Sequence, residues 1–176
     1  MPKVIEGLED RILRAARKRL LGEELSSFSL RGVAGDCGIA VGTIYNYFRN
    51  KETLMAAVMA QDWTDALKRT REDLEHAESL EEGLLHICRA IRNFCAVYRE
   101  VWSSYPAGGE FSTRYRKRHE MLLSQIMEMM KSLFARFEVP CSETGSTLYA
   151  ELIIAGAQHP EIREEEIIEI IGKAIV

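Results

Sequence analysis

The sequence predicts an all-α protein built from two helical parts. Apolar residues recur every three or four positions along almost the whole chain, which is the period of a helix, and no segment of useful length alternates with the period of a strand. Near the N-terminus, two short helical patterns flank a glycine-led turn over residues 38–40, an arrangement typical of a helix-turn-helix. We therefore expect a helix-turn-helix domain of three helices over residues 1–50 and a second helical domain over residues 51–176.

The first three helices each have a distinct sequence signal. The spacing of apolar residues predicts a helix over 7–21. Ser29 is a suitable N-cap for a second helix over 30–37, and Gly38 ends that helix because it tolerates a positive φ. The third helix is expected over 41–48.

Past residue 50 the helical patterns become longer. Asn50 caps a helix over 51–76, and Ser79 caps the next helix, which extends to Tyr98. The stretch SSYPAGGEFS, residues 103–112, reads as a loop. The remaining expected helices are one that includes 122–137 and is stopped by Pro140, one over 143–157 and one over 161–175.

Composition narrows the classes of protein. The 176 residues are 47% hydrophobic and 28% charged, so the chain has enough apolar residues for a buried core. It has no run of about 18 apolar residues, the length needed to span a membrane. Four cysteines lack CxxC spacing and the histidines are scattered, so we expect reduced thiols in a cytoplasmic protein, with no metal site and no cofactor. The amphipathic start resembles no signal peptide.

The charge is distributed unevenly. The chain has a net charge of −4, yet residues 1–51 hold nine Lys and Arg against six Asp and Glu, whereas residues 52–176 hold fourteen against twenty-one. A basic front joined to an acidic remainder suggests that the two parts have different partners.

The helix over 41–48 has the properties of a DNA-reading helix. Ile44 and Phe48 lie four residues apart and are expected to pack inward, which directs Asn46 and its two tyrosine neighbours outward. A helix fits the major groove of DNA, and an asparagine carboxamide can pair with adenine. The alternative, in which both tyrosines belong to the core, conflicts with their spacing of two. The candidate DNA contacts are Arg31, Val41, Gly42, Thr43, Tyr45, Asn46, Tyr47 and Lys51.

The segment FSLRGVAGDCGIAVGTIYNYFRNKETL, residues 28–54, resembles the DNA-binding segment of the TetR (tetracycline repressor) family of transcriptional regulators. Gly32 and Gly35 depart from the family pattern, and each costs a helix about 1 kcal/mol relative to alanine. Val41 also departs, because it cannot hydrogen-bond a base through its side chain. The matching residues are Phe28, Ser29, Arg31, Ala34, Gly38, Ile39, Gly42, Thr43, Ile44, Tyr45, Tyr47, Phe48, Lys51, Glu52 and Leu54.

The resemblance implies a homodimeric repressor that binds a palindromic double-stranded DNA operator and is released by a small-molecule effector. It implies that Thr43, Tyr45, Tyr47 and Lys51 contact phosphates. It also implies that Val41, Gly42 and Asn46 face bases. The second domain would then hold the effector pocket and a dimerising four-helix bundle.

Two sets of residues in the second domain are candidates for these roles. The candidate effector residues lie mainly on apolar helix faces, and such faces more often form the core than a binding site. For His119, the alternative to effector binding is a hydrogen-bonded structural histidine. The candidate effector-binding residues are Cys88, Ile91, Phe94, Cys95, Tyr98, Trp102, His119 and Met127. The candidate dimer residues, chosen for small or branched apolar side chains near the C-terminus, are Leu148, Leu152, Ala155, Gly156, Ile167, Ile170 and Ile171.

Two other classes of function compete with a regulator. An enzyme is disfavoured because the sequence shows no nucleophile elbow, metal motif, phosphate loop or paired catalytic carboxylates. A helical interaction module that has lost DNA binding is the second alternative. The joint presence of Thr43, Tyr45, Tyr47 and Lys51 argues against it.

Overall fold

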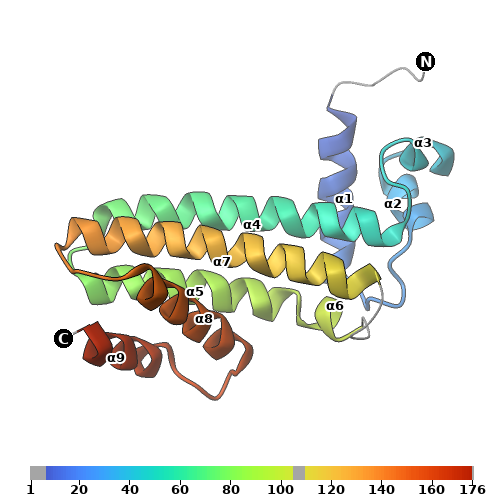
Figure 1. The fold of residues 1–176 in the computed structure, drawn as a ribbon. Helices are drawn as coiled ribbons and strands as arrows, with labels where there is room; N and C mark the ends of the chain where they lie inside the picture. The colour runs from blue at the N-terminus through green and yellow to red at the C-terminus, as the bar shows by residue number, and fades with distance from the viewer. Residues whose placement is uncertain (1–6, 105–109, 176) are drawn as a thin grey trace. The chain divides into compact units, whose positions relative to one another are not determined.

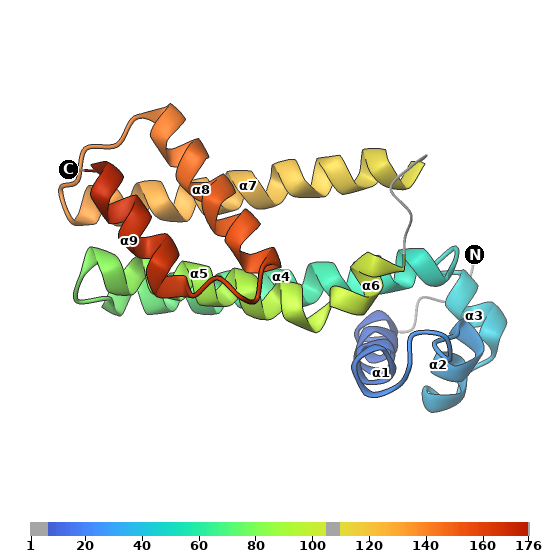
Figure 2. The ribbon, with the colours of Figure 1, turned by 90° about the horizontal axis from the view of Figure 1, so that it is seen from below.

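The computed structural model describes residues 7–104 and 110–175, apart from the side chains of 102 and 110–119, and this part of the chain holds helices and no strands (Figures 1 and 2). The all-α prediction is therefore confirmed. The helices in chain order are α1 (Leu8–Gly22), α2 (Leu30–Asp36), α3 (Val41–Tyr45), α4 (Lys51–His76), α5 (Leu80–Val97), α6 (Arg99–Ser103), α7 (Glu110–Arg136), α8 (Glu143–Gln158) and α9 (Glu164–Ile175).

The chain divides into two compact units, Met1–Thr64 and Asp65–Val176, called unit 1 and unit 2 below. The division falls inside α4, whereas the sequence pattern placed a domain boundary between residues 50 and 51. The first half of α4 therefore belongs with the three short helices, because Leu54 and Val58 are buried in the same unit.

Unit 1 is organised by α1 and by the turn between α2 and α3. The predicted N-cap is present, since Ser29 Oγ accepts a hydrogen bond from the Gly32 N–H at 3.2 Å. Gly38 has a φ of 62°, and the next N–H, that of Ile39, donates to the Ala34 carbonyl at 3.0 Å. This left-handed residue ends α2 and turns the chain into α3 as the sequence predicted.

Helix α3 is shorter than the predicted 41–48. Its regular part ends at Tyr45, and the following N–H groups bond three residues back, Asn46 to Thr43 at 3.2 Å and Tyr47 to Ile44 at 2.9 Å. The last turn is therefore tightened, a common feature at helix ends. The Phe48 N–H still donates to the Ile44 carbonyl at 2.8 Å, and both side chains are buried, as the spacing predicted.

Helix α4 begins with a reciprocal cap. The Thr53 N–H donates to Asn50 Oδ1 at 2.8 Å, and the Asn50 N–H donates to Thr53 Oγ1 at 3.1 Å. The cap confirms the predicted start of α4, at Lys51.

In unit 2, α5 packs against α6, α7, α8 and α9, and α8 also contacts α7 and α9. Two glycines permit close approach of helices. A Cβ at Gly83 of α5 would lie 2.4 Å from Leu133 of α7, and a Cβ at Gly156 of α8 would lie 2.3 Å from Ile167 of α9. Both positions therefore exclude a larger residue without rearrangement.

Three predicted boundaries in unit 2 are wrong. Helix α7 ends at Arg136, well before Pro140, because Glu138 adopts a φ of 56° and the Val139 N–H returns to the Phe134 carbonyl. Helix α9 begins at Glu164 rather than 161, where the Arg163 N–H donates to the Glu166 carboxylate. The short α6 was not predicted, and α7 starts at Glu110, inside the predicted loop over 103–112.

The end of α4 is fixed to α7 within unit 2. Arg136 donates hydrogen bonds from its guanidinium to the carbonyls of Leu74 and Ala77.

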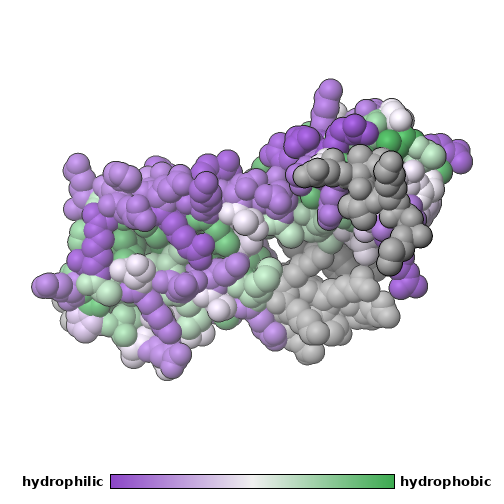
Figure 3. Space-filling model, turned by 90° about the horizontal axis from the view of Figure 1, so that it is seen from above, coloured by the Kyte–Doolittle hydropathy of each residue, from purple (hydrophilic) through white to green (hydrophobic). Residues whose placement is uncertain are grey.

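The exposed side of α4 is hydrophilic. Figure 3 shows a band of hydrophilic residues along this helix, and the exposed residues of α4 in unit 2 include Lys68, Glu72 and Glu75. None of the helices among the described residues is both long and apolar enough to cross a membrane.

Candidate nucleic-acid interface

Helix α3 has one buried face and one exposed face. Ile44 is fully buried and Phe48 is 5% exposed, so these two side chains attach the helix to unit 1. Tyr45 is 55% exposed and Asn46 is exposed, whereas Tyr47 is half-buried. The structure therefore presents the asparagine and one tyrosine fully to solvent, with the second tyrosine at the edge of that surface.

The first turn of α3 combines small and hydroxyl-bearing residues. Gly42 is exposed, and a Cβ built on it would meet nothing within 4 Å, so its backbone is open to close approach. Val41 and Thr43 are half-buried. The Thr43 N–H donates to the Ala40 carbonyl at 2.9 Å, so this N–H is used within the turn.

Lys51 is held in place by unit 1 itself. Its ammonium donates to the Leu25 carbonyl at 3.0 Å and lies 5.6 Å from the centre of the Phe28 ring. A lysine ammonium has three N–H donors, so donors remain for a phosphate. The sequence offered no signal for this anchoring, because Leu25 is 26 residues away and contributes only its backbone.

Four exposed cations of unit 1 are distinct from the anchored Lys51, and they form no ion pair among the described side chains. Arg31 on α2 is exposed, as are Arg14 and Lys18 on α1 and Arg49 directly after Phe48. Arg49 is not among the residues that the sequence predicted, although its position directly after Phe48 could have suggested it.

Other arginines of α1 are bound to the protein. In the structure Arg17 Nε lies 2.7 and 2.8 Å from the two carboxylate oxygens of Asp62 on α4. Arg11 Nη2 donates to the Cys37 carbonyl at 3.1 Å, at the end of α2. These contacts attach α1 to α2 and α4. The Cys37 side chain is buried at the same place, and this burial raises the pKa of its thiol.

The effector candidates of unit 2 are mostly buried. Cys88, Ile91 and Tyr98 are buried, and the rings of Phe94 and Tyr98 lie 5.1 Å apart. Cys95 and Met127 are half-buried. The side chains of Trp102 and His119 lie outside the described residues. Burial raises the pKa of the Cys88 thiol to about 12, so this thiol is neutral at physiological pH.

The dimer candidates divide by burial. Leu148 is 63% exposed and Ile170 is 54% exposed, Ala155 is exposed and Leu152 is half-buried. Three others, Gly156, Ile167 and Ile171, are buried inside unit 2, where α8 and α9 meet. Only the first four side chains are available to a second chain.

Arg92 on α5 holds α9 in place beside α8. Its Nε lies 3.0 Å from Glu164 Oε1 as an ion pair, at an angle that forms no hydrogen bond. Its Nη2 donates to the Ile162 carbonyl and lies 3.5 Å from the Gly156 carbonyl. Arg92 therefore supports the two helices that carry the exposed apolar residues.

The second helix of this helix-turn-helix exposes polar and aromatic side chains, and unit 1 also carries exposed cations. These features are typical of the class of helix-turn-helix DNA-binding proteins. Residues 12–58, from α1 into α4, match the family described as bacterial regulatory proteins, tetR family. This segment of the chain is therefore a DNA-binding domain of the TetR type, and the match supports the role of a DNA-binding transcriptional regulator.

Individual relatives agree with this assignment. The regulator UidR of Escherichia coli K12 is 24% identical over 132 residues, which cover 73% of this chain and 67% of UidR. Among solved structures, the regulator SCO7518 of Streptomyces coelicolor is similar with a TM-score of 0.65, 15% identity, and coverage of 97% of this chain and 99% of that one. Bacillus subtilis FadR in complex with stearoyl-CoA is similar with a TM-score of 0.60, 14% identity, and coverage of 94% and 95%. The two structural similarities bear on the fold alone.

Proposed function

We propose that the protein is a homodimeric repressor that binds a palindromic operator through α3 and leaves it when a small-molecule effector binds in unit 2. The observation that carries the proposal is the exposed face of α3, with Tyr45 and Asn46 turned to solvent and Ile44 fully buried. A regulator of this kind acts on chromosomal DNA in the cytoplasm, without a cofactor or a catalysed reaction of its own.

The proposed contacts follow from side-chain chemistry. The Asn46 carboxamide pairs with an adenine edge, and the small Gly42 lets the backbone approach the bases beside Val41. Thr43, Tyr45 and Tyr47 donate hydroxyl hydrogen bonds to phosphates, where Lys51 adds a charge. Arg31 and the additional candidate Arg49 extend the phosphate-binding surface on either side.

The proposed dimer surface consists of the exposed apolar residues of α8 and α9. Leu148, Leu152, Ala155 and Ile170 would otherwise leave apolar area in contact with water. A two-fold axis through this surface gives two copies of α3, which must lie about 34–36 Å apart to enter successive major grooves on one side of DNA.

The proposed effector is an apolar molecule. The buried residues of α5 and the half-buried Cys95 and Met127 are apolar or weakly polar, so an effector held among them would be mainly apolar. The complex of B. subtilis FadR with stearoyl-CoA supports the choice of a long acyl chain as the first class of compound to test.

The DNA-binding part of the proposal is tested by selecting a duplex from a random-sequence pool and measuring its affinity by fluorescence anisotropy. Lys51→Ala is expected to weaken binding to all duplexes and to reduce the salt dependence by about one charge. The matched control is Arg69→Ala, which removes an exposed cation of α4 in unit 2. Equal effects of the two substitutions would contradict the proposed role of Lys51.

The dimer is tested separately by sedimentation. Leu148→Glu and Ile170→Glu place charges at the proposed interface and are expected to give monomers. Leu21→Glu, at an exposed apolar residue of unit 1, is the control and is expected to remain dimeric. A dimer that survives both interface substitutions would place the interface elsewhere.

A further inference from the structure

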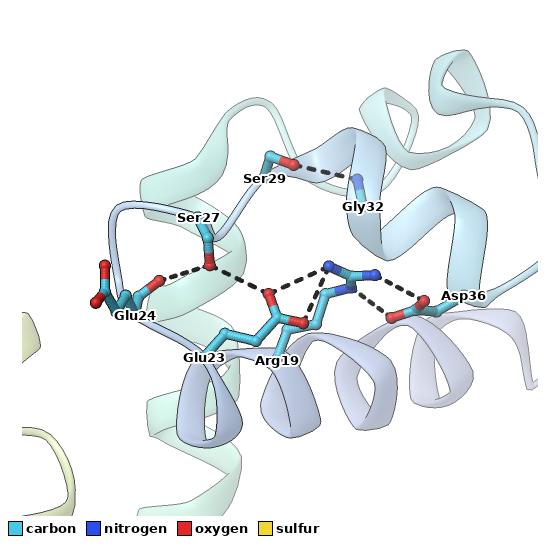
Figure 4. A network of polar contacts seen from close by, with 7 residues as sticks. All are labelled: Arg19, Glu23, Glu24, Ser27, Ser29, Gly32 and Asp36. Atoms are coloured by element: carbon cyan, nitrogen blue, oxygen red, sulfur yellow. Dashed lines mark hydrogen bonds and ion pairs between the residues drawn. The ribbon is translucent and has the colours of Figure 1, made fainter.

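Arg19 of α1 binds Asp36 of α2 through a bidentate pair of hydrogen bonds (Figure 4). Its Nε donates to Asp36 Oδ2 and its Nη2 donates to Asp36 Oδ1 at 2.8 Å. A guanidinium that meets both oxygens of a carboxylate fixes direction as well as distance. The hydrogen bonds to Arg19 hold the pKa of Asp36 below its usual range, so the pair is ionised at neutral pH.

The same guanidinium also organises the loop that leads into α2. Its Nη1 lies 3.2 and 3.3 Å from the two carboxylate oxygens of Glu23. Ser27 Oγ lies 3.2 Å from Glu23 Oε2 and donates to the Glu24 carbonyl at 2.7 Å. Arg19 thus contacts both Glu23, at the end of α1, and Asp36 of α2, and Glu23 connects it to Ser27 in the loop (Figure 4).

Gly32 supplies the space in which the guanidinium lies. A Cβ at Gly32 would be 2.8 Å from Arg19 Nη1 and 3.0 Å from Cζ, whereas a Cβ at Gly35 would meet nothing within 4 Å. The sequence showed both glycines only as poor helix formers. The structure separates them, because only a Cβ at Gly32 would require a neighbouring side chain, the flexible end of Arg19, to move.

The position of α2 is passed on to α3 through a short turn. The Gly38 N–H donates to the Gly35 carbonyl and the Ile39 N–H donates to the Ala34 carbonyl, both at 3.0 Å. A turn closed by these two hydrogen bonds leaves little freedom between the helices. A displacement of α2 on α1 therefore displaces the exposed face of α3.

We propose that Arg19 is a positioning residue for DNA binding, which sets the place of α3 by binding Asp36 in the space left by Gly32. It acts through α2 and makes no contact with DNA. The inference rests on the proposed use of α3 as the reading helix, and the following experiments separate the two ideas.

The first experiment measures affinity for a duplex that the unmodified protein selects from a random pool. Arg19→Ala and Asp36→Ala are each expected to weaken binding about three- to tenfold with the same salt slope. The charge exchange that combines Arg19→Asp with Asp36→Arg is expected to recover part of the loss. Lys18→Ala, at the adjacent exposed cation, serves as the control for loss of a positive charge from α1.

A phosphate contact by Arg19 would give a different result. Asp36→Ala would then leave the affinity unchanged or raise it, and Arg19→Ala would reduce the salt slope by about one. That outcome would overturn the proposal. If no duplex is selected at all, the use of α3 as the reading helix fails instead.

The second experiment needs no DNA and no change of charge. Gly32→Ala is expected to speed amide hydrogen exchange in α2 and α3, because the new Cβ displaces the guanidinium. Gly35→Ala, a matched substitution in the same helix, is expected to slow exchange there, since alanine favours the helix. Similar exchange in the two variants would contradict the role assigned to Gly32 and Arg19.

Discussion

The side chains of α3 divide between fixing the helix and presenting it. Ile44 and Phe48 are buried, and the exposed Asn46 lies between them along the chain. This division explains how three aromatics can occur within four residues without forming one cluster. Phe48 is part of the core, whereas Tyr45 faces solvent and Tyr47 lies at the boundary.

The buried face of α3 yields a stability prediction. Ile44→Ala leaves a cavity at a fully buried site and is expected to lower the free energy of unfolding of unit 1 by about 2–5 kcal/mol. Thermal and urea unfolding followed by circular dichroism measure this loss. Asn46→Ala, at the exposed neighbour, is expected to leave unfolding unchanged while it weakens DNA binding. A large loss of stability in that variant would show that Asn46 is structural.

Cys88 provides a pH-dependent prediction. Burial raises the pKa of this thiol from 9.0 to about 12, so the folded state keeps the proton that the unfolded chain releases. The contribution of Cys88 to stability is therefore complete below about pH 9 and is lost as the pH rises toward 12. Unfolding curves between pH 8 and pH 11, compared with those of Cys88→Ala, measure the effect. Equal pH dependence in both proteins would contradict it.

At the scale of elements, the sequence predicted helices better than their ends. Periodicity located α1, α2, α4 and α5, and the caps at Ser29, Asn50 and Ser79 were recognisable because each is a local contact. The end of α7 was not, since Glu138 takes a positive φ without being glycine or asparagine.

The contacts between elements were also hidden from the sequence. Arg19 and Asp36 are 17 residues apart, and Arg17 and Asp62 are 45 apart. Pairs of this kind depend on where the helices lie in space, and many other charges in the sequence could have paired equally well. The candidate DNA-facing residues were easier to identify, because a single short helix with a resemblance carries most of them.

The end of α4 gives a prediction at this scale. Arg136→Met removes the donors to the Leu74 and Ala77 carbonyls and is expected to destabilise unit 2 by about 1–2 kcal/mol. Arg71→Met is the matched control, since it breaks only an exposed ion pair with Glu128 and is expected to cost about 0–1 kcal/mol. Hydrogen exchange at the last turn of α4 measures the difference. Equal losses would show that the two carbonyl contacts add nothing.

At the scale of the whole molecule, one continuous helix belongs to both units. Helix α4 is bound to α1 by Asp62 in unit 1 and to α7 by the contacts of Arg136 in unit 2. Helix α4 therefore connects the two units covalently, and we propose that a change in unit 2 on effector binding reaches unit 1 through this helix. This arrangement supports the proposed release of DNA by an effector.

The proposed dimer predicts the geometry of its operator. Two chains are expected to bind one duplex with half-sites about one helical turn apart, or a whole number of turns apart. Inserting about 5 base pairs between the half-sites turns the second one to the opposite face and is expected to reduce affinity to that of a single half-site. Inserting about 10 base pairs is the control, since it returns the second half-site to the same face of the duplex as the first. Equal affinities for both insertions would contradict a rigid two-fold complex.

The most direct test of the central claim compares a selected duplex with a scrambled duplex of the same composition, for the unmodified protein and Asn46→Ala. The unmodified protein is expected to prefer the selected duplex, and Asn46→Ala is expected to lose about 1–3 kcal/mol of that preference while its affinity for the scrambled duplex stays the same. Equal affinity of the unmodified protein for both duplexes, or an unchanged preference in Asn46→Ala, would contradict the assignment of α3 as the helix that reads DNA.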